Sequence, residues 1–202
     1  MKSHWRFLSI AGFVLLIDQA TKLFVKLHYP LGHEIPWVGS WLKLHFVENP
    51  GAAFGLSLSG FLQESPSDAT SKILLASLSI LITAGIGYYF WQAVPAEPRM
   101  AIPAGLIVGG AVGNLIDRIF YGVLFASINS YEGGWFQGHV VDFIYVDLWQ
   151  GVVPEWVPLW GGEYLALWPV FNVADSCITV GVLWLLLQNL LNKAFVPRTG
   201  AS

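Results

Sequence analysis

The stretch FNVADSCITVGVLWLLLQNLL, residues 171–191, gives the first indication of the fold. Most of it is apolar, and its length is close to the roughly 20 residues that an α-helix needs to cross the hydrocarbon core of a bilayer. Asn172 and Asp175 nevertheless stand at its beginning. Ionisable side chains within a membrane are costly and usually face a partner or a wet cavity. The stretch therefore predicts a membrane span with a polar site at one mouth.

The composition of the whole chain agrees with a protein embedded in lipid. Its 202 residues are 55% hydrophobic and only 11% charged, and the mean hydropathy is +0.59. A soluble domain usually carries about 25% charged residues. The net charge of −3 gives no reason to expect a nucleic-acid partner, which favours basic surfaces. Cys177, the one cysteine, excludes an internal disulfide, and we interpret it as a small buried residue because an apolar setting suppresses thiolate formation.

The apolar runs predict an all-α membrane protein in which one domain, residues 1–202, holds four transmembrane helices. The spans are expected at about 5–25, 73–91, 101–120 and 171–191. Lys2 and Arg6 precede the first run, as in a secretory signal, but no A-x-A cleavage pattern follows. We therefore interpret the first run as a retained span.

Basic residues near the span ends set the orientation, because cytoplasmic loops carry an excess of Lys and Arg. Residues 121–170 contain neither. Five basic residues border the opposite side: Lys2, Arg6, Arg99, Lys193 and Arg198. Four lysines, Lys22, Lys26, Lys43 and Lys72, fall on the outer side and oppose this trend. We predict that both termini and the turn 92–100 are cytoplasmic, with outer segments at about 27–71 and 121–170.

The outer segments contain β-prone runs. WLKLHFVE (41–48) alternates apolar and polar residues, as a half-buried strand does, and GHVVDFIYVDLW (138–149) is a second run of this kind. We expect a small extracytoplasmic β-rich cradle. Five of the ten tryptophans lie in 121–170 and are expected to anchor it at the membrane–water interface: Trp135, Trp149, Trp156, Trp160 and Trp168.

In this topology, polar residues far apart in the sequence converge on the outer membrane face. They are Asp18, Lys22, Asn114, Asp117, Arg118, Asn172 and Asp175, with Asp142 in the outer loop. Simpler roles exist for individual members. Asp18 and Lys22 have the spacing of a helical ion pair, Asp175 suits the positive end of a helix dipole, and Asn114 and Arg118 share a helical face suited to hydrogen bonds between helices. Gly109 and Gly113 have the spacing of a close helix contact. Asn49, before Pro50 and Gly51, has either a capping or a recognition role. The convergence of the whole set favours a functional site.

Asp142 and Asp175 are the acids best suited to carry chemistry. If two carboxylates face each other, both cannot easily be ionised. A pair that shares one proton can activate a water molecule while its protonated member polarises an amide carbonyl. His139 has no convincing companion ligands, because the other histidines of the outer region are scattered. We expect neither a metal ion nor another cofactor.

Five sequence blocks occur in an order that resembles the lipoprotein signal peptidases, also called signal peptidase II. They are DQATK (18–22), NPGAAFG (49–55), GGAVGNLIDR (109–118), GHVVDF (138–143) and FNVADS (171–176). The resemblance implies a four-span aspartyl endopeptidase of the bacterial inner membrane, with its active site near the periplasmic face. Such enzymes remove the signal peptide from diacylglyceryl-modified prolipoproteins by cutting before the lipidated cysteine.

The same resemblance implies roles for individual residues. Asp142 and Asp175 would be the catalytic dyad. The remaining site residues would bind substrate or support the dyad: Asp18, Lys22, Asn49, Gly110, Asn114, Arg118 and Asn172. Prolipoproteins and membrane lipids are the expected partners, and a monomer is the expected state. Extra residues at 122–137 and 146–168 depart from the compact family pattern. We expect the part at 125–137 to tune substrate fit without being required for chemistry.

Two other classes of function use the same residues. A proton-coupled transporter would use the acids as a relay, but here the polar groups gather at one face and no inverted repeat is visible. A non-catalytic membrane scaffold or lipid-binding protein is the other alternative. The order of the five blocks argues against both alternatives.

Overall fold

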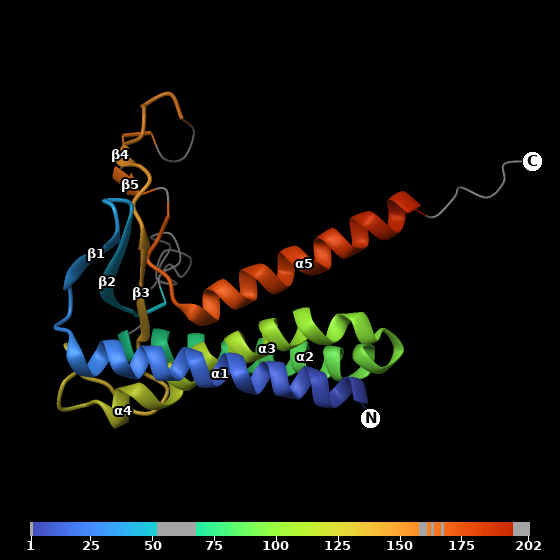
Figure 1. The fold of residues 1–202 in the computed structure, drawn as a ribbon. Helices are drawn as coiled ribbons and strands as arrows, with labels where there is room; N and C mark the ends of the chain where they lie inside the picture. The colour runs from blue at the N-terminus through green and yellow to red at the C-terminus, as the bar shows by residue number, and fades with distance from the viewer. Residues whose placement is uncertain (1, 52–67, 158–160, 163, 167, 196–202) are drawn as a thin grey trace, which may run out of the picture. The chain divides into compact units, whose positions relative to one another are not determined.

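The computed structural model describes residues 2–51, 68–157, 161–162, 164–166 and 168–195 (Figure 1). Part of the predicted NPGAAFG block, residues 52–55, lies outside the described residues, as do Trp160 and Arg198. The contacts among the described residues group into two compact units. The first comprises Met1–Gln19, Leu78–Leu115 and Val173–Ser202, and the second comprises Ala20–Ser77 and Ile116–Asn172.

Four long apolar helices occupy the predicted spans. They are α1 (Lys2–His28), α2 (Asp68–Ala96), α3 (Ala101–Ile116) and α5 (Val173–Phe195). Each lies in a candidate membrane span by length and composition, which confirms the four-span prediction. α1 and α2 run past the predicted ends and stop near prolines. α1 ends at His28, two residues before Pro30, because proline disfavours a helical conformation at the residue before it.

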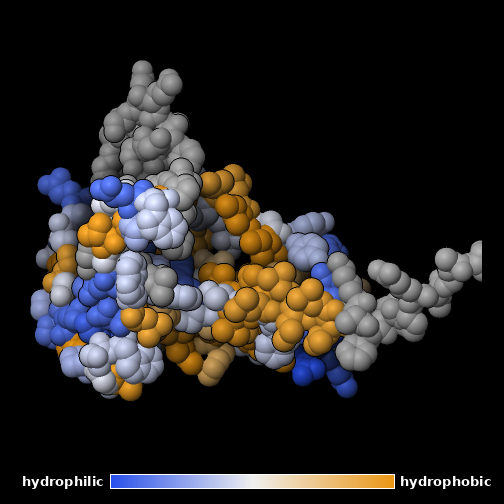
Figure 2. Space-filling view, turned by 90° about the horizontal axis from the view of Figure 1, so that it is seen from above, coloured by the Kyte–Doolittle hydropathy of each residue, from blue (hydrophilic) through white to orange (hydrophobic). Residues whose placement is uncertain are grey.

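The helices keep large apolar side chains on their outer faces. Leu16, Leu81 and Leu190 are 68%, 70% and 65% exposed, and hydrophobic side chains gather over the helices in Figure 2. Such exposure is costly in water but not in lipid. The span that contains α3 differs, since half of its most apolar window is buried against 11–22% in the other three spans. The chain is therefore a multi-pass membrane protein in which the third span is the most enclosed.

The core of the first unit lies where three helices meet. Its buried residues come from α1, α2 and α3: Phe7, Phe90, Val94, Ala101, Ala104 and Ile107. Leu185 of α5 packs against this cluster. The small residues Ala101 and Ala104 let the larger rings fill the space between the helices.

The third span is not the single α-helix that the sequence predicts. After α3 the chain forms a π-helical segment, η3 (Asp117–Tyr121), and then the short helix α4 (Gly122–Leu124). Two carbonyl groups of this segment accept hydrogen bonds from the outer loop: Gly138 N–H donates to Arg118 O at 2.9 Å, and Phe136 N–H donates to Ile119 O at 3.1 Å. π-helical turns occur frequently at functional sites. Here the turn contains Asp117 and Arg118.

The second unit contains a three-stranded antiparallel sheet of order β1-β2-β3 (Figure 1). The strands are β1 (Glu34–Val38), β2 (Leu42–Asn49) and β3 (Val140–Val146). The two β-prone runs of the sequence become β2 and β3, which confirms both. β1 was not predicted because Pro36 interrupts it, and it is tolerated as an edge strand, where one side of the backbone needs no partner. A small hairpin of β4 (Gln150–Val152) and β5 (Tyr164–Ala166) forms in the second inserted stretch.

Candidate functional site

Asp142 lies in β3 and is 2% exposed. Both of its carboxylate oxygens accept an amide hydrogen bond. Asn172 Nδ2 donates to Oδ1 at 2.7 Å, and Asn49 Nδ2 donates to Oδ2 at 3.0 Å. The two asparagines come from the two separate segments of the second unit, so the fold itself orients the carboxylate.

Asn49 reaches Asp142 because β2 and β3 pair in a fixed register. Asn49 lies opposite Val140, and Val47 lies opposite Asp142. The Oδ1 atom of Asn49 accepts the N–H of Gly51 at 2.8 Å, where the chain turns with a φ of +108° that favours glycine. Asn49 thus caps the turn after β2, one of the two roles that the sequence left open, and it also holds the acid.

Asn172 is fully buried and is fixed by a short bridge to β3. The N–H groups of Phe143 and Ile144 donate to Phe171 O at 3.0 and 2.7 Å. The Asn172 amide also lies 3.3 Å from Val141 O. The chain entering α5 is therefore attached to the strand that carries Asp142.

A buried ion pair supports β3 at the residue before Asp142. Lys22 Nζ lies 2.9 Å from Asp117 Oδ2, and both side chains are 0% exposed. The same oxygen accepts Val141 N–H at 3.2 Å. The sequence grouped Asp117 with the polar residues but assigned it no role, although it lies within the GNLIDR block beside Arg118. Arg118 is half-buried in η3, and its carbonyl anchors Gly138.

The first outer insertion packs against the same strand. Tyr131 Oη accepts His139 N–H at 2.9 Å, and the two rings stack with centroids 3.6 Å apart. Lys72 Nζ lies 4.9 Å from the centre of the Tyr131 ring. Burial raises the pKa of the Tyr131 phenol to about 12. Tyr131 therefore fixes the chain three residues before Asp142.

A second contact holds the insertion to β2. Glu48 accepts a hydrogen bond from Lys26 and another from Ser130 Oγ, the latter at 3.2 Å. The Lys26 and Glu48 side chains are 2% and 4% exposed. Sequence reasoning did not find this pairing, because it depends on where the end of α1 meets β2.

Asp175 belongs to the first unit, in the first turn of α5. Asn114 Nδ2 of α3 donates to its Oδ1 at 2.7 Å. A carboxylate is favourable at this end of a helix because the helix dipole is positive there. Asn114 and Asp175 are thus brought together as the sequence predicted, with an amide again as the donor.

Asp18 caps the same helix. Its buried carboxylate accepts Ala174 N–H at 2.9 Å, which satisfies one of the N–H groups left unpaired at a helix start. Gln19 Nε2 bridges Asp18 and the carbonyl of Gly113, at 3.2 Å each. Asp18 therefore positions the beginning of α5, where Asp175 lies.

Two glycines of α3 make this arrangement possible. A methyl group on Gly110 would overlap the carbonyl oxygen of Ala174, and one on Gly113 would overlap the Asp18 carboxylate. Gly110 therefore lets α5 approach α3 closely. The predicted glycine contacts at Gly109 and Gly113 are also present, with Gly109 packing on Ala11 of α1.

The described contacts thus form two polar clusters, one in each unit. Asp142 lies with Asn49 and Asn172 in the second, and Asp175 lies with Asn114 and Asp18 in the first. Among the described residues, no group of three or more His, Cys, Asp and Glu side chains is arranged to hold a metal ion.

Comparisons with known proteins agree on one family. The sequence profile of the family "Signal peptidase (SPase) II" matches residues 10–191. The lipoprotein signal peptidase of Amoebophilus asiaticus is 38% identical over 193 residues, which cover 93% of this chain and 78% of that protein. The one from Chlorobaculum parvum is 37% identical, with 91% and 93% covered. A bacterial membrane enzyme solved at 2.3 Å by the in meso method aligns with a TM-score of 0.64 and 25% identity, covering 97% of this chain and 94% of that one.

Proposed function

Because the chain belongs to the signal peptidase II family, we propose that it is an aspartic endopeptidase that matures bacterial lipoproteins. It removes the signal peptide from a diacylglyceryl-modified prolipoprotein and cuts before the lipidated cysteine. Asp142 and Asp175 form the catalytic dyad. The observation that carries this assignment is that each acid, set within a family block, is oriented by asparagine amides.

The connectivity of the chain supports the pairing of the two acids. Asn172, which is hydrogen-bonded to Asp142, precedes Asp175 by three residues. Three residues span at most about 11 Å even when fully extended. The chain path therefore limits how far Asp175 can lie from the residue that holds Asp142.

The mechanism follows from two carboxyl groups that share one proton. The ionised member accepts a proton from water while the water oxygen attacks the amide carbon. The protonated member donates a hydrogen bond to the carbonyl oxygen and stabilises the negative charge that develops there. Collapse of the tetrahedral intermediate breaks the C–N bond, and a carboxyl proton goes to the departing amine. No cofactor is required.

The remaining residues position these groups. Asn49 and Asn172 fix the Asp142 carboxylate, and Asn114 fixes that of Asp175. Asp18 and Gly110 set the start of α5 against α3. Lys22 supports the site through Asp117, and Arg118 contributes to a polar lining at the end of the third span.

We further propose the location of the site. The chain is a monomeric, single-domain protein of the bacterial inner membrane, surrounded by lipid, with both termini in the cytoplasm. β1, β2 and β3 form the extracytoplasmic cradle, and the dyad lies near the periplasmic face, where the signal peptide emerges. The distribution of Lys and Arg supports this orientation.

The test is a cleavage assay with purified full-length protein and a diacylglyceryl-modified prolipoprotein, read by mass spectrometry of the products. Asp142→Asn and Asp175→Asn should each abolish cleavage, because asparagine cannot take up and deliver the proton. The double variant should be little worse than either single one, because the two groups act as a unit. Activity of the unaltered enzyme should fall at both pH extremes, since one carboxyl must be ionised and the other protonated.

Two control variants accompany the assay. Asp147→Asn removes a carboxylate that pairs with Lys43 just beyond β3, and it should leave cleavage nearly unchanged. Cys177→Ala should also remain active, which separates this mechanism from thiol catalysis. Near-normal cleavage by a folded Asp142→Asn or Asp175→Asn protein would contradict the assigned dyad.

A further inference from the structure

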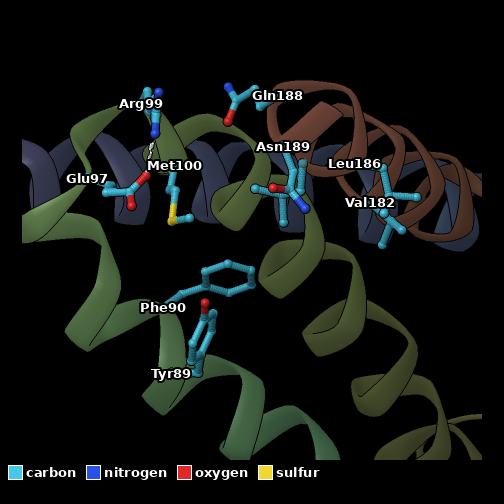
Figure 3. Close-up of a pocket in the computed structure, with 10 residues that line it drawn as sticks. Tyr89, Phe90, Glu97, Arg99, Met100, Val182, Leu186, Gln188 and Asn189 are labelled. Carbon is cyan, nitrogen blue, oxygen red and sulfur yellow. Dashed lines mark hydrogen bonds and ion pairs between the residues drawn. The ribbon is translucent and has the colours of Figure 1, made fainter. Parts of the chain in front are cut away.

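A cavity of 410 Å³ lies in the first unit, away from Asp175 (Figure 3). It is lined by residues of α2, of the 3₁₀ turn η2 (Pro98–Met100) and of α5 from Val182 to Asn189, with Glu97 between α2 and η2. Asp175 begins α5, and Gln188 at the cavity lies 13 residues later, which is about 20 Å along a helix at 1.5 Å per residue. The cavity is therefore a separate site. Its volume is in the range of pockets that hold small ligands, about 300–1,000 Å³.

The walls of the cavity change from apolar to charged along the helices. Tyr89 and Phe90 of α2 lie at one end, and Val182 and Leu186 of α5 line the side (Figure 3). Both aliphatic side chains are exposed, at 42% and 54%, on a helix that spans a membrane. The cavity is therefore open to lipid, and an acyl chain is the apolar group available in that environment.

The charged end carries one group of each sign. Arg99 Nε and Nη2 donate to Glu97 Oε2 at 3.1 and 2.9 Å, and both side chains remain about half exposed. The amide side chains of Gln188 and Asn189 lie at the same cavity. This end has no net charge, so a purely anionic head group would meet Glu97 as well as Arg99. A head group with an ammonium and a phosphate complements both.

We propose that this cavity binds a zwitterionic aminophospholipid of the phosphatidylethanolamine class. The phosphate is held by Arg99 and the primary ammonium by Glu97, while the amides bind ester oxygens and one acyl chain follows Phe90 and Leu186. In the proposed orientation this is the cytoplasmic leaflet, because Arg99 lies in the turn between the second and third spans. The site would couple the protein to the lipid composition of the leaflet opposite the peptidase site.

The test measures lipid binding to the purified, delipidated full chain by native mass spectrometry. The probes are phosphatidylethanolamine, phosphatidylcholine and phosphatidylglycerol with identical dioleoyl chains. Phosphatidylethanolamine should bind at least about fivefold more tightly than either of the others, equivalent to about 1 kcal/mol. Phosphatidylcholine has no N–H to donate to Glu97, and phosphatidylglycerol has no cation.

Variants assign the binding to this cavity. Glu97→Gln should remove the preference over phosphatidylcholine, and Arg99→Gln should weaken binding of all three lipids. Leu186→Trp should block the acyl chain, whereas Leu187→Trp, on the neighbouring residue that does not line the cavity, should bind as the unaltered chain does. Arg6→Gln is the matched control for the loss of a basic residue outside the cavity.

Several results would overturn the proposal. Equal affinity for the three lipids would exclude a head-group site, and a preference for phosphatidylglycerol would indicate an anionic-lipid site instead. Equal losses in Leu186→Trp and Leu187→Trp would show that lipid binds elsewhere on α5. Because binding is read without any cleavage, these outcomes are independent of the proposed peptidase activity.

Discussion

Replacing Lys22 by methionine should destabilise the protein strongly. Lys22 Nζ and Asp117 Oδ2 are 2.9 Å apart, and both side chains are completely buried. Methionine keeps most of the apolar length of lysine but removes the charge. The substitution therefore leaves the Asp117 carboxylate in a low-dielectric interior without the Lys22 charge. Val141 N–H still donates a hydrogen bond to this carboxylate, but it carries no full charge to replace that of Lys22.

The expected size of the effect follows from this burial. Removing one partner of a buried ion pair typically costs about 3–5 kcal/mol, mostly because a charge is left uncompensated. For a chain of about 200 residues, each kcal/mol corresponds to about 2–4 °C in Tm, so Tm should fall by about 6–20 °C. Asp117→Asn should cost a similar amount. The Lys22→Met/Asp117→Asn double variant should be more stable than the sum of the two losses predicts by at least about 2 kcal/mol.

The assay is thermal unfolding in a single detergent, followed by circular dichroism at a helix wavelength. Lys43→Met is the matched control, because Lys43 pairs with Glu34 and Asp147 at the surface of the second unit, where its side chain is 19% exposed. Partly exposed ion pairs contribute less than fully buried ones, so this variant should lose about 4 °C or less. The reasoning fails if Lys22→Met loses no more Tm than Lys43→Met, or if the two buried substitutions are simply additive.

Three further predictions concern topology, the insertion and helix packing. Reporter fusions after Met100 and after Gly134 should report opposite sides of the membrane, and the same side for both would contradict the proposed four-span orientation. In the folded state the pKa of the Tyr131 phenol is about 12, above its ordinary value of 10. The stability of the fold should therefore be complete below pH 10 and fall as pH rises toward 12. Tyr131→Phe should abolish that fall in pH-dependent unfolding while retaining cleavage, and an unchanged pH profile would refute the assignment. Gly110→Ala should lower both Tm and cleavage because it forces α5 away from α3, whereas Gly12→Ala, which meets no atom within 4 Å, should be neutral or slightly stabilising.

The membrane spans were predictable because composition and length alone decide them. The strands β2 and β3 were predictable from local alternation. The π-helical segment Asp117–Tyr121 was not, because hydrogen bonds from residues of the outer loop accompany it. β1 was not predicted for a similar reason. Its sequence, EIPWV, has little tendency to form a strand alone, and pairing with β2 stabilises it as a strand.

In the candidate site, too, the sequence predicted which residues are present but not which residues they contact. The motif blocks identified Asp142, Asp175 and the asparagines individually. That Asn49 holds Asp142 depends on the register of β2 against β3, which shifts between Leu44 and Val47 and cannot be counted from the sequence. The capping of α5 by Asp18 joins residues 156 positions apart.

The buried and half-buried acids of this chain use two different kinds of partner. Asp117 and Glu48 pair with Lys22 and Lys26. The hydrogen bonds described for Asp142 and Asp175 come instead from neutral amides.

A neutral donor orients a carboxyl group without supplying a full opposite charge. Two acids that must share a proton need this kind of support, because a lysine beside each would favour ionisation of both and leave no acid to polarise the carbonyl. The lysine pairs are suited to holding the structure, and the amides are suited to holding groups whose protonation must change. Asp18 also takes neutral donors, from Ala174 N–H and the Gln19 amide, so amide support fits the proposed roles of Asp142 and Asp175 without being unique to them.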